Sequence, residues 1–103
     1  MWQKQGEKQL LRAIVALETK EEAARFLRDL MTKSEIEEFT NRFTAAEMLS
    51  RNKPYKAVEK ATGLSSTTVA RVSRWLHRGE GGYKTIIARL HHHNPIQPRR
   101  GLS

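Results

Sequence analysis

The segment Ala61–Leu76 reads ATGLSSTTVARVSRWL and carries the spacing of a helix-turn-helix around Gly63. Two helices joined by a tight turn cross at a steep angle, so a glycine suits the turn and short apolar side chains suit the wedge between the helices. Such side chains flank the glycine at helical intervals: Val58, Ala61, Leu64, Val69, Val72 and Leu76. The spacing predicts a helix-turn-helix over about residues 54–78.

The second helix of this motif has an apolar face and a polar face. At about 100° per residue, Val72, Ser73 and Leu76 fall within about 60° of Val69. The opposite side collects Thr67, Ala70, Arg71, Arg74 and Arg78, and no acidic residue lies between positions 61 and 76. Arginine can pair with guanine edges, hydroxyl groups can bond bases or phosphates, and an alanine methyl can contact thymine. The pattern is typical of a recognition helix.

The expected DNA contacts therefore follow from this face and from the residues before it. Lysines ahead of and within the first helix can hold the phosphate backbone and set orientation, whereas the second helix chooses the sequence. The candidates are Lys53 and Lys56 for the backbone, Ser65 and Thr68 near the start of the second helix, and Ser66, Thr67, Ala70, Arg71 and Arg74 for sequence choice.

The charge distribution agrees with a polyanionic partner. The net charge of the 103-residue chain is +8. Residues 1–50 carry eight Lys/Arg and nine Asp/Glu, whereas residues 51–103 carry eleven Lys/Arg and two Asp/Glu, so the whole excess lies in the second half. Such asymmetry favours nucleic acid as the partner of that half.

The remaining sequence predicts helices throughout and no strands. The length suits one domain, which we place at residues 1–91, with a flexible basic tail at 92–103. A capping box at Ser34–Glu37 opens the third helix, whose buried stripe would include Phe39. The expected helices are 4–18, 20–31, from 34 to about 50, 54–62, a helix to about 78 that has Ser65 or Ser66 as its N-cap, and 83–91.

The first two helices are apolar over an unusually wide arc. The apolar residues of the first span about 200° and those of the second about 160°, compared with a stripe of about 100° on a one-sided surface helix. A chain of this size has little with which to cover both sides. We therefore expect a second subunit, in a symmetric homodimer.

The residues LMTKSEIEEFTNRFTAAEML, NKPYKAVEKATGLSSTTVARVSRWL and GEGGYKTIIARL, in this order, resemble the tryptophan repressor superfamily. In detail they are similar to its Trp-repressor-like YerC/YecD-type proteins. The resemblance implies an all-α, six-helix fold with a helix-turn-helix, assembled as an intertwined homodimer. It also implies two recognition helices spaced for a palindromic operator.

The resemblance further implies an effector pocket for tryptophan, between two arginines and a threonine. The matching positions are Arg42, Arg71 and Thr32. However, Val72 stands where the family has glycine, and Trp75 stands where it has a serine that receives the ligand's amino group. Because both side chains would fill the space of the ligand, we expect no tryptophan co-repressor. Either Trp75 occupies the pocket or another effector is used, and Arg71 could contact DNA instead.

The sequence gives little support for a metal site, a catalytic site or a membrane-spanning segment. Three adjacent histidines, His91–His93, point about 100° apart on a helix and cannot converge on one metal ion, and His77 has no nearby carboxylate partner for catalysis. There is no cysteine and no apolar run long enough for a signal or a membrane span. We expect a cytoplasmic protein without metal, cofactor, membrane partner or enzymatic activity.

The sequence thus predicts a transcriptional regulator, specifically a repressor. It would bind double-stranded DNA in a sequence-specific way, as a homodimer. One alternative is a nucleoid- or origin-associated DNA-binding protein. Another is an adaptor whose basic half docks an acidic protein. Mobility shifts against random and genomic duplexes would separate these alternatives.

Overall fold

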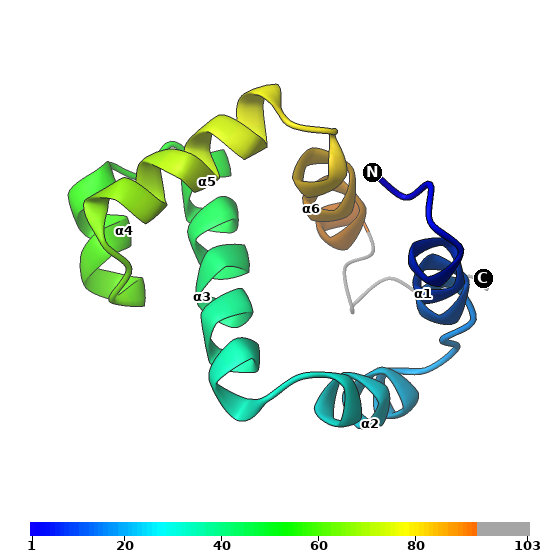
Figure 1. Cartoon of the computed structure of the whole chain (residues 1–103). Helices are drawn as coiled ribbons and strands as arrows, with labels where there is room; N and C mark the ends of the chain where they lie inside the picture. The colour runs from blue at the N-terminus through cyan, green and yellow to red at the C-terminus, as the bar shows by residue number, and fades with distance from the viewer. Residues whose placement is uncertain (93–103) are drawn as a thin grey trace. The chain divides into compact units, whose positions relative to one another are not determined.

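Six helices make up the described part of the chain, residues 1–92, in a computed structural model (Figure 1). No strand occurs in this range, which confirms the predicted all-α class. Of the tail predicted at 92–103, His92 ends the last helix and the rest lies outside the described residues. The helices are α1 (Gln5–Val15), α2 (Lys20–Leu30), α3 (Lys33–Ser50), α4 (Tyr55–Thr62), α5 (Ser66–Arg78) and α6 (Gly82–His92).

Hydrogen bonds from side chains fix where the early helices begin. The Thr19 hydroxyl accepts from the backbone N–H of Glu22 at 3.0 Å at the start of α2. At α3, Thr32 accepts from the N–H of Glu35 at 3.1 Å, and the Glu35 carboxylate accepts from the N–H of Thr32 at 2.9 Å. The capping box is thus Thr32–Glu35. The prediction of Ser34–Glu37 was wrong, because Ser34 already lies in the first turn of α3.

The predicted helix-turn-helix corresponds to α4 and α5. Pro54 precedes α4, and Gly63 ends it with φ of +74°, a left-handed conformation that glycine adopts without a steric penalty. The Gly63 N–H donates to the carbonyl of Glu59 at 2.8 Å. Ser65 is then the N-cap of α5 and accepts from the N–H of Thr68 at 3.2 Å, which settles the choice between Ser65 and Ser66.

The end of α5 also depends on a glycine. A Cβ atom at Gly79 would clash with the backbone carbonyl of Trp75 in the preceding turn. The chain then passes through Glu80 and Gly81 into α6, which begins at Gly82, one residue earlier than predicted.

The chain forms two compact units, one that ends at Ile36 and a second that starts at Glu37. In the second unit α5 packs against both α4 and α6. The apolar residues that are buried among residues 1–92 all belong to this unit and come from its four helices: Ala45, Ala46, Leu49, Val58, Val69, Val72, Leu76 and Ile87. The core of this unit is therefore the support on which α5 rests.

Two positions on the inner side of these helices differ from the prediction. Ala61 is exposed, because Thr62 faces inward in its place and donates its hydroxyl to the carbonyl of Val58 at 2.8 Å. The same hydroxyl accepts from the N–H of Leu64 at 3.2 Å, so a buried polar group bridges the turn. Phe39, predicted within the buried stripe of α3, is 45% exposed.

The first unit has no core of its own. Neither α1 nor α2 contains a buried residue. Large apolar side chains stand at the surface of both helices, and Val15 is 83% exposed. Leu11, Val15 and Ala16 line an apolar depression on α1 together with Arg12. The apolar side chains of α1 and α2 are therefore not buried by packing within their own unit.

Candidate nucleic-acid interface

Helix α5 presents the two faces that its sequence predicts. Val69 and Val72 are fully buried and Leu76 is nearly so, which anchors one side of the helix in the core. Thr67, Ala70 and Arg71 are exposed on the other side. Arg74 and Arg78 are exposed as well. The exposed side chains of α5 are thus carried by a helix whose opposite side is anchored in the core.

The four consecutive hydroxyl residues at the start of α5 divide into two pairs. The Ser65 and Thr68 hydroxyls lie 3.0 Å apart and bond to each other, while Ser65 also caps the helix. Ser66 and Thr67 are exposed, and their hydroxyls form no hydrogen bond with the described residues. Ser65 and Thr68 therefore shape the helix end, whereas Ser66 and Thr67 remain available to a ligand.

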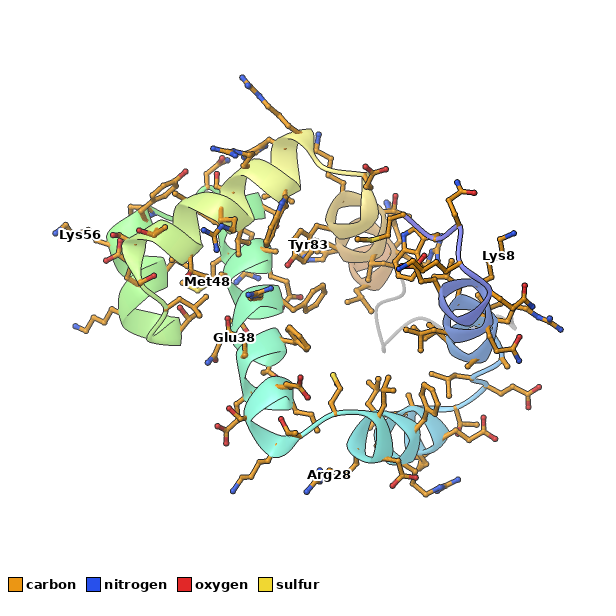
Figure 2. The ribbon with its side chains drawn as sticks, viewed as in Figure 1. Lys8, Arg28, Glu38, Met48, Lys56 and Tyr83 are labelled. Atoms are coloured by element: carbon orange, nitrogen blue, oxygen red, sulfur yellow. The ribbon has the colours of Figure 1, made fainter. Side chains whose placement is uncertain are left out.

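The cations near the motif are not neutralised within the described part of the chain. The one ion pair found in residues 1–92 joins Arg42 to Glu38. Lys53 and Lys56 are exposed at the entry to α4, and Lys56 points away from the ribbon of this helix (Figure 2). The uncompensated positive charge favours binding of an anionic polymer.

Arg42 lies at the centre of an aromatic and ionic cluster. Its Nε donates to the Glu38 carboxylate at 3.0 Å. Its guanidinium carbon lies 5.5 Å from the ring centroid of Phe39 and 5.7 Å from that of Trp75, distances typical of cation–π contacts. The indole of Trp75 thus lies against the arginine that the resemblance assigns to the effector pocket.

A large open hollow lies beside this cluster. It has a volume of about 830 Å³ and is lined mainly by apolar and aromatic side chains of α3, α5 and α6, including Phe43, Trp75, Tyr83 and Ile86. Arg74, Arg78 and Glu80 complete the polar part of its lining. We refer to it as the aromatic hollow.

Tyr83 is held within the wall of the aromatic hollow. It extends from α6 toward α3 (Figure 2), and its ring centroid lies 6.3 Å from that of Phe43. Burial raises the pKa of the Tyr83 phenol above its ordinary value of 10.0, and the positive charge of Arg42 partly opposes this change. Tyr83 is therefore a neutral, packed side chain at physiological pH.

A second, smaller hollow lies on the outer side of α4 and α5. It has a volume of about 380 Å³, and we refer to it as the basic hollow. Its lining consists of Tyr55, Ala70, Ser73, Arg74, His77 and Arg78. Sequence reasoning selected Ala70 and Arg74 but missed Tyr55, Ser73 and His77 as site residues, since their grouping depends on how α4 crosses α5.

The predicted effector residues have different surroundings. Arg42 is engaged by Glu38, Phe39 and Trp75. The Thr32 hydroxyl is used in the cap of α3. Arg71 is exposed on α5 and forms no ion pair with the described residues.

Two further features were sought in residues 1–92: a metal-binding group of side chains and a helix of membrane-spanning length. No group of three or more histidine or acidic side chains is placed to hold a metal ion in that range, and His93 of the predicted histidine run lies outside it. None of the helices in the same range is both long enough and apolar enough to span a membrane.

Comparison with known proteins places this geometry in a family. Residues 5–91 match the family described as Trp repressor protein. The chain is 37% identical over 82 residues to the uncharacterized protein YerC of Bacillus subtilis (strain 168), an alignment that covers 80% of this chain and 79% of YerC.

Solved structures agree with the sequence match. A TrpR-like protein from Eubacterium eligens ATCC 27750 is similar with a TM-score of 0.82 and 36% identity, over 87% of this chain and 93% of that one. A Trp-repressor-type protein from Staphylococcus aureus is similar with a TM-score of 0.81 and 32% identity, over 86% and 89% of the two chains. The family is one of DNA-binding regulators rather than of enzymes. The chain therefore belongs to the Trp repressor family, as a member of its YerC type.

Proposed function

We propose that this protein is a sequence-specific transcriptional regulator, a repressor, that binds a palindromic DNA operator as a homodimer. One observation carries the proposal: the face of α5 opposite its buried valines offers hydroxyl and guanidinium groups and no acid. These groups are exposed and form no ion pair with the rest of the described chain. Membership of a DNA-binding family supports the same conclusion. Such a regulator acts in the cytoplasm, where bacterial DNA is found.

In this proposal the N-terminal half of α5 enters the major groove. Ser66, Thr67, Ala70 and Arg71 reach the base edges, because they are the exposed residues nearest the helix N-terminus. Lys53 and Lys56 contact phosphates on the flank of the site and supply affinity that depends on salt. Ser65 and Thr68 contribute by fixing the end of the helix, and the backbone there lies beside the phosphates.

The apolar surface that each unit leaves exposed supports the proposed homodimer. Helices α1 and α2 bury no residue, although Leu11, Ile14, Val15 and Leu30 lie on them. The second unit carries an open hollow walled by aromatic and aliphatic side chains. A second copy of the chain would cover both kinds of surface at once, in a symmetric and reciprocal way.

We also propose that free tryptophan is not the effector. Val72 is fully buried in the core, and the Trp75 ring already contacts Arg42. An incoming indole would have to displace these contacts. Isothermal titration calorimetry should detect no binding of L-tryptophan at micromolar concentration. Micromolar affinity would contradict this part of the proposal.

The central experiment is selection of bound duplexes from a random library, followed by anisotropy titrations of the selected duplex and a shuffled control. We expect the selected duplex to bind at least about 10³-fold more tightly, as specific sites generally do. Equal affinities would favour a nucleoid-type protein. Absence of binding even at low salt would favour a protein adaptor. Light scattering on the same samples should give the mass of a dimer.

A further inference from the structure

The basic hollow has the composition of an anion site. Its wall carries the guanidinium groups of Arg74 and Arg78, the imidazole of His77 and the hydroxyls of Tyr55 and Ser73, with no carboxylate among its lining residues. Ala70 leaves space between them because its side chain is a single methyl group. Two fixed cations and several hydrogen-bond donors around one open space attract an anion with several acceptor oxygens.

The groups that line the basic hollow are not satisfied by neighbouring residues. Neither arginine forms an ion pair within residues 1–92. Tyr55 is exposed and Ser73 is half-buried. The Lys84 ammonium group lies 3.5 Å from the backbone carbonyl of His77, and the His77 ring forms no ion pair with the described residues. A neutral imidazole still donates one N–H, so the site does not depend on the charge of His77.

The size and position of the hollow suit a phosphate of the DNA backbone. The hollow is open to solvent and, at about 380 Å³, has room for a phosphodiester group. The hollow lies along α5 on the C-terminal side of Ser66 and Thr67, and it shares Ala70 with the residues that face the major groove in the proposed function. At this distance along the helix, a side chain would meet the sugar–phosphate strand that borders the groove.

We propose that the basic hollow binds one phosphodiester of the operator, through Arg74, Arg78, Tyr55 and His77. The inference rests on the proposed function and changes one part of the sequence-based prediction: Arg74 positions the duplex instead of choosing its sequence. Arg78 and Tyr55 become DNA contacts that the motif alone does not indicate.

The test compares the salt dependence of binding for three single variants. Arg78→Gln removes one positive charge from the hollow and Tyr55→Phe removes one hydroxyl donor, whereas Arg89→Gln removes a cation from the exposed part of α6, outside the hollow. Anisotropy titrations of the selected and shuffled duplexes at several KCl concentrations give the slope of log K against log [KCl]. Circular dichroism confirms that each variant is folded.

We expect Arg78→Gln to make the slope less steep by about 2, because the dimer loses one phosphate contact in each half-site and each contact contributes about 0.9. Its loss of affinity should be equal on both duplexes, since a phosphate carries no sequence information. Tyr55→Phe should weaken binding about a hundredfold with an unchanged slope, since it removes a hydrogen bond to a charged group in each half-site but no charge. Arg89→Gln should match the wild type.

A double variant shows whether the two groups hold the same phosphate. If they do, Tyr55→Phe combined with Arg78→Gln should lose less affinity than the product of the two single losses. An Arg78→Gln slope equal to that of the wild type, or Arg74→Ala losing more affinity on the selected than on the shuffled duplex, would overturn the inference while leaving the proposed function standing. Failure of the wild-type protein to bind any duplex would overturn the proposed function itself.

Discussion

Gly63 joins α4 to α5, and replacing it measures how much the turn depends on a left-handed backbone. Its φ is +74°, and a Cβ atom built there meets no heavy atom within 4 Å. A substitution therefore adds backbone strain without a steric clash. For alanine the left-handed conformation costs about 1 kcal/mol. Asparagine, which tolerates this region, should cost less, and a β-branched valine should cost more.

Thermal unfolding followed by circular dichroism, at one fixed protein concentration, tests this ranking. A loss of about 1 kcal/mol should lower the Tm of Gly63→Ala by roughly 4–8 °C for a chain of this size. Gly63→Asn should lie between the wild type and Gly63→Ala, and Gly63→Val below both. A Tm for Gly63→Ala equal to that of the wild type, or a Gly63→Val variant more stable than Gly63→Ala, would refute the claim that the turn requires this backbone conformation.

Three further perturbations test the support of α5 and the aromatic hollow. Val69→Ala should lower the free energy of unfolding by about 2 kcal/mol in urea titrations, because this fully buried side chain loses two methyl groups and leaves a cavity; an unchanged urea midpoint would contradict its place in the core. Gly79→Ala should be worse tolerated than Gly63→Ala in the same assay, since its Cβ clashes with the Trp75 carbonyl; the reverse order would show that this helix end can relax. Above about pH 10 the unfolded chain loses the Tyr83 proton before the folded chain does, so stability should fall as pH rises through this range. Tyr83→Phe should reduce that fall, and an equally steep fall in the variant would assign it to other groups.

The arrangement around α5 was largely predictable from sequence because it depends on local rules. The three- and four-residue spacing of Val69, Val72 and Leu76 marks the buried face, and Gly63 marks the turn. The helices themselves followed from periodicity, and their ends fell within a few residues of the predicted positions. Such features are encoded over one or two helical turns.

The predictions of the α3 capping box and of the inward residue of α4 were wrong because two neighbouring residues could each fill the role. Thr32 and Ser34 each have a glutamate three residues later, and both pairs fit a capping box, but only the first lies at the start of α3. On α4 the spacing of apolar residues predicts Ala61 on the buried side. Thr62 took the inward position because its hydroxyl is satisfied by the carbonyl of Val58.

The two hollows could not be predicted from the sequence, because their residues are brought together only by tertiary packing. Tyr55 and His77 are more than twenty positions apart, and no spacing rule connects them. The contact of Trp75 with Arg42 likewise depends on how α5 crosses α3. The family resemblance indicated that Trp75 could fill a pocket, but not which side chain it would meet.

The most direct test of the account is the ratio of affinities for the selected and shuffled duplexes, measured by anisotropy for the wild type and for the double variant Thr67→Ala/Arg71→Ala. Lys84→Ala/Arg89→Ala, on the exposed part of α6, is the control. If α5 reads base edges, the Thr67/Arg71 variant should lose at least about tenfold of this ratio, since a good base contact contributes about 1–3 kcal/mol of discrimination, and the control should keep it. A ratio unchanged in the Thr67/Arg71 variant would contradict the claim that this face of α5 chooses the sequence.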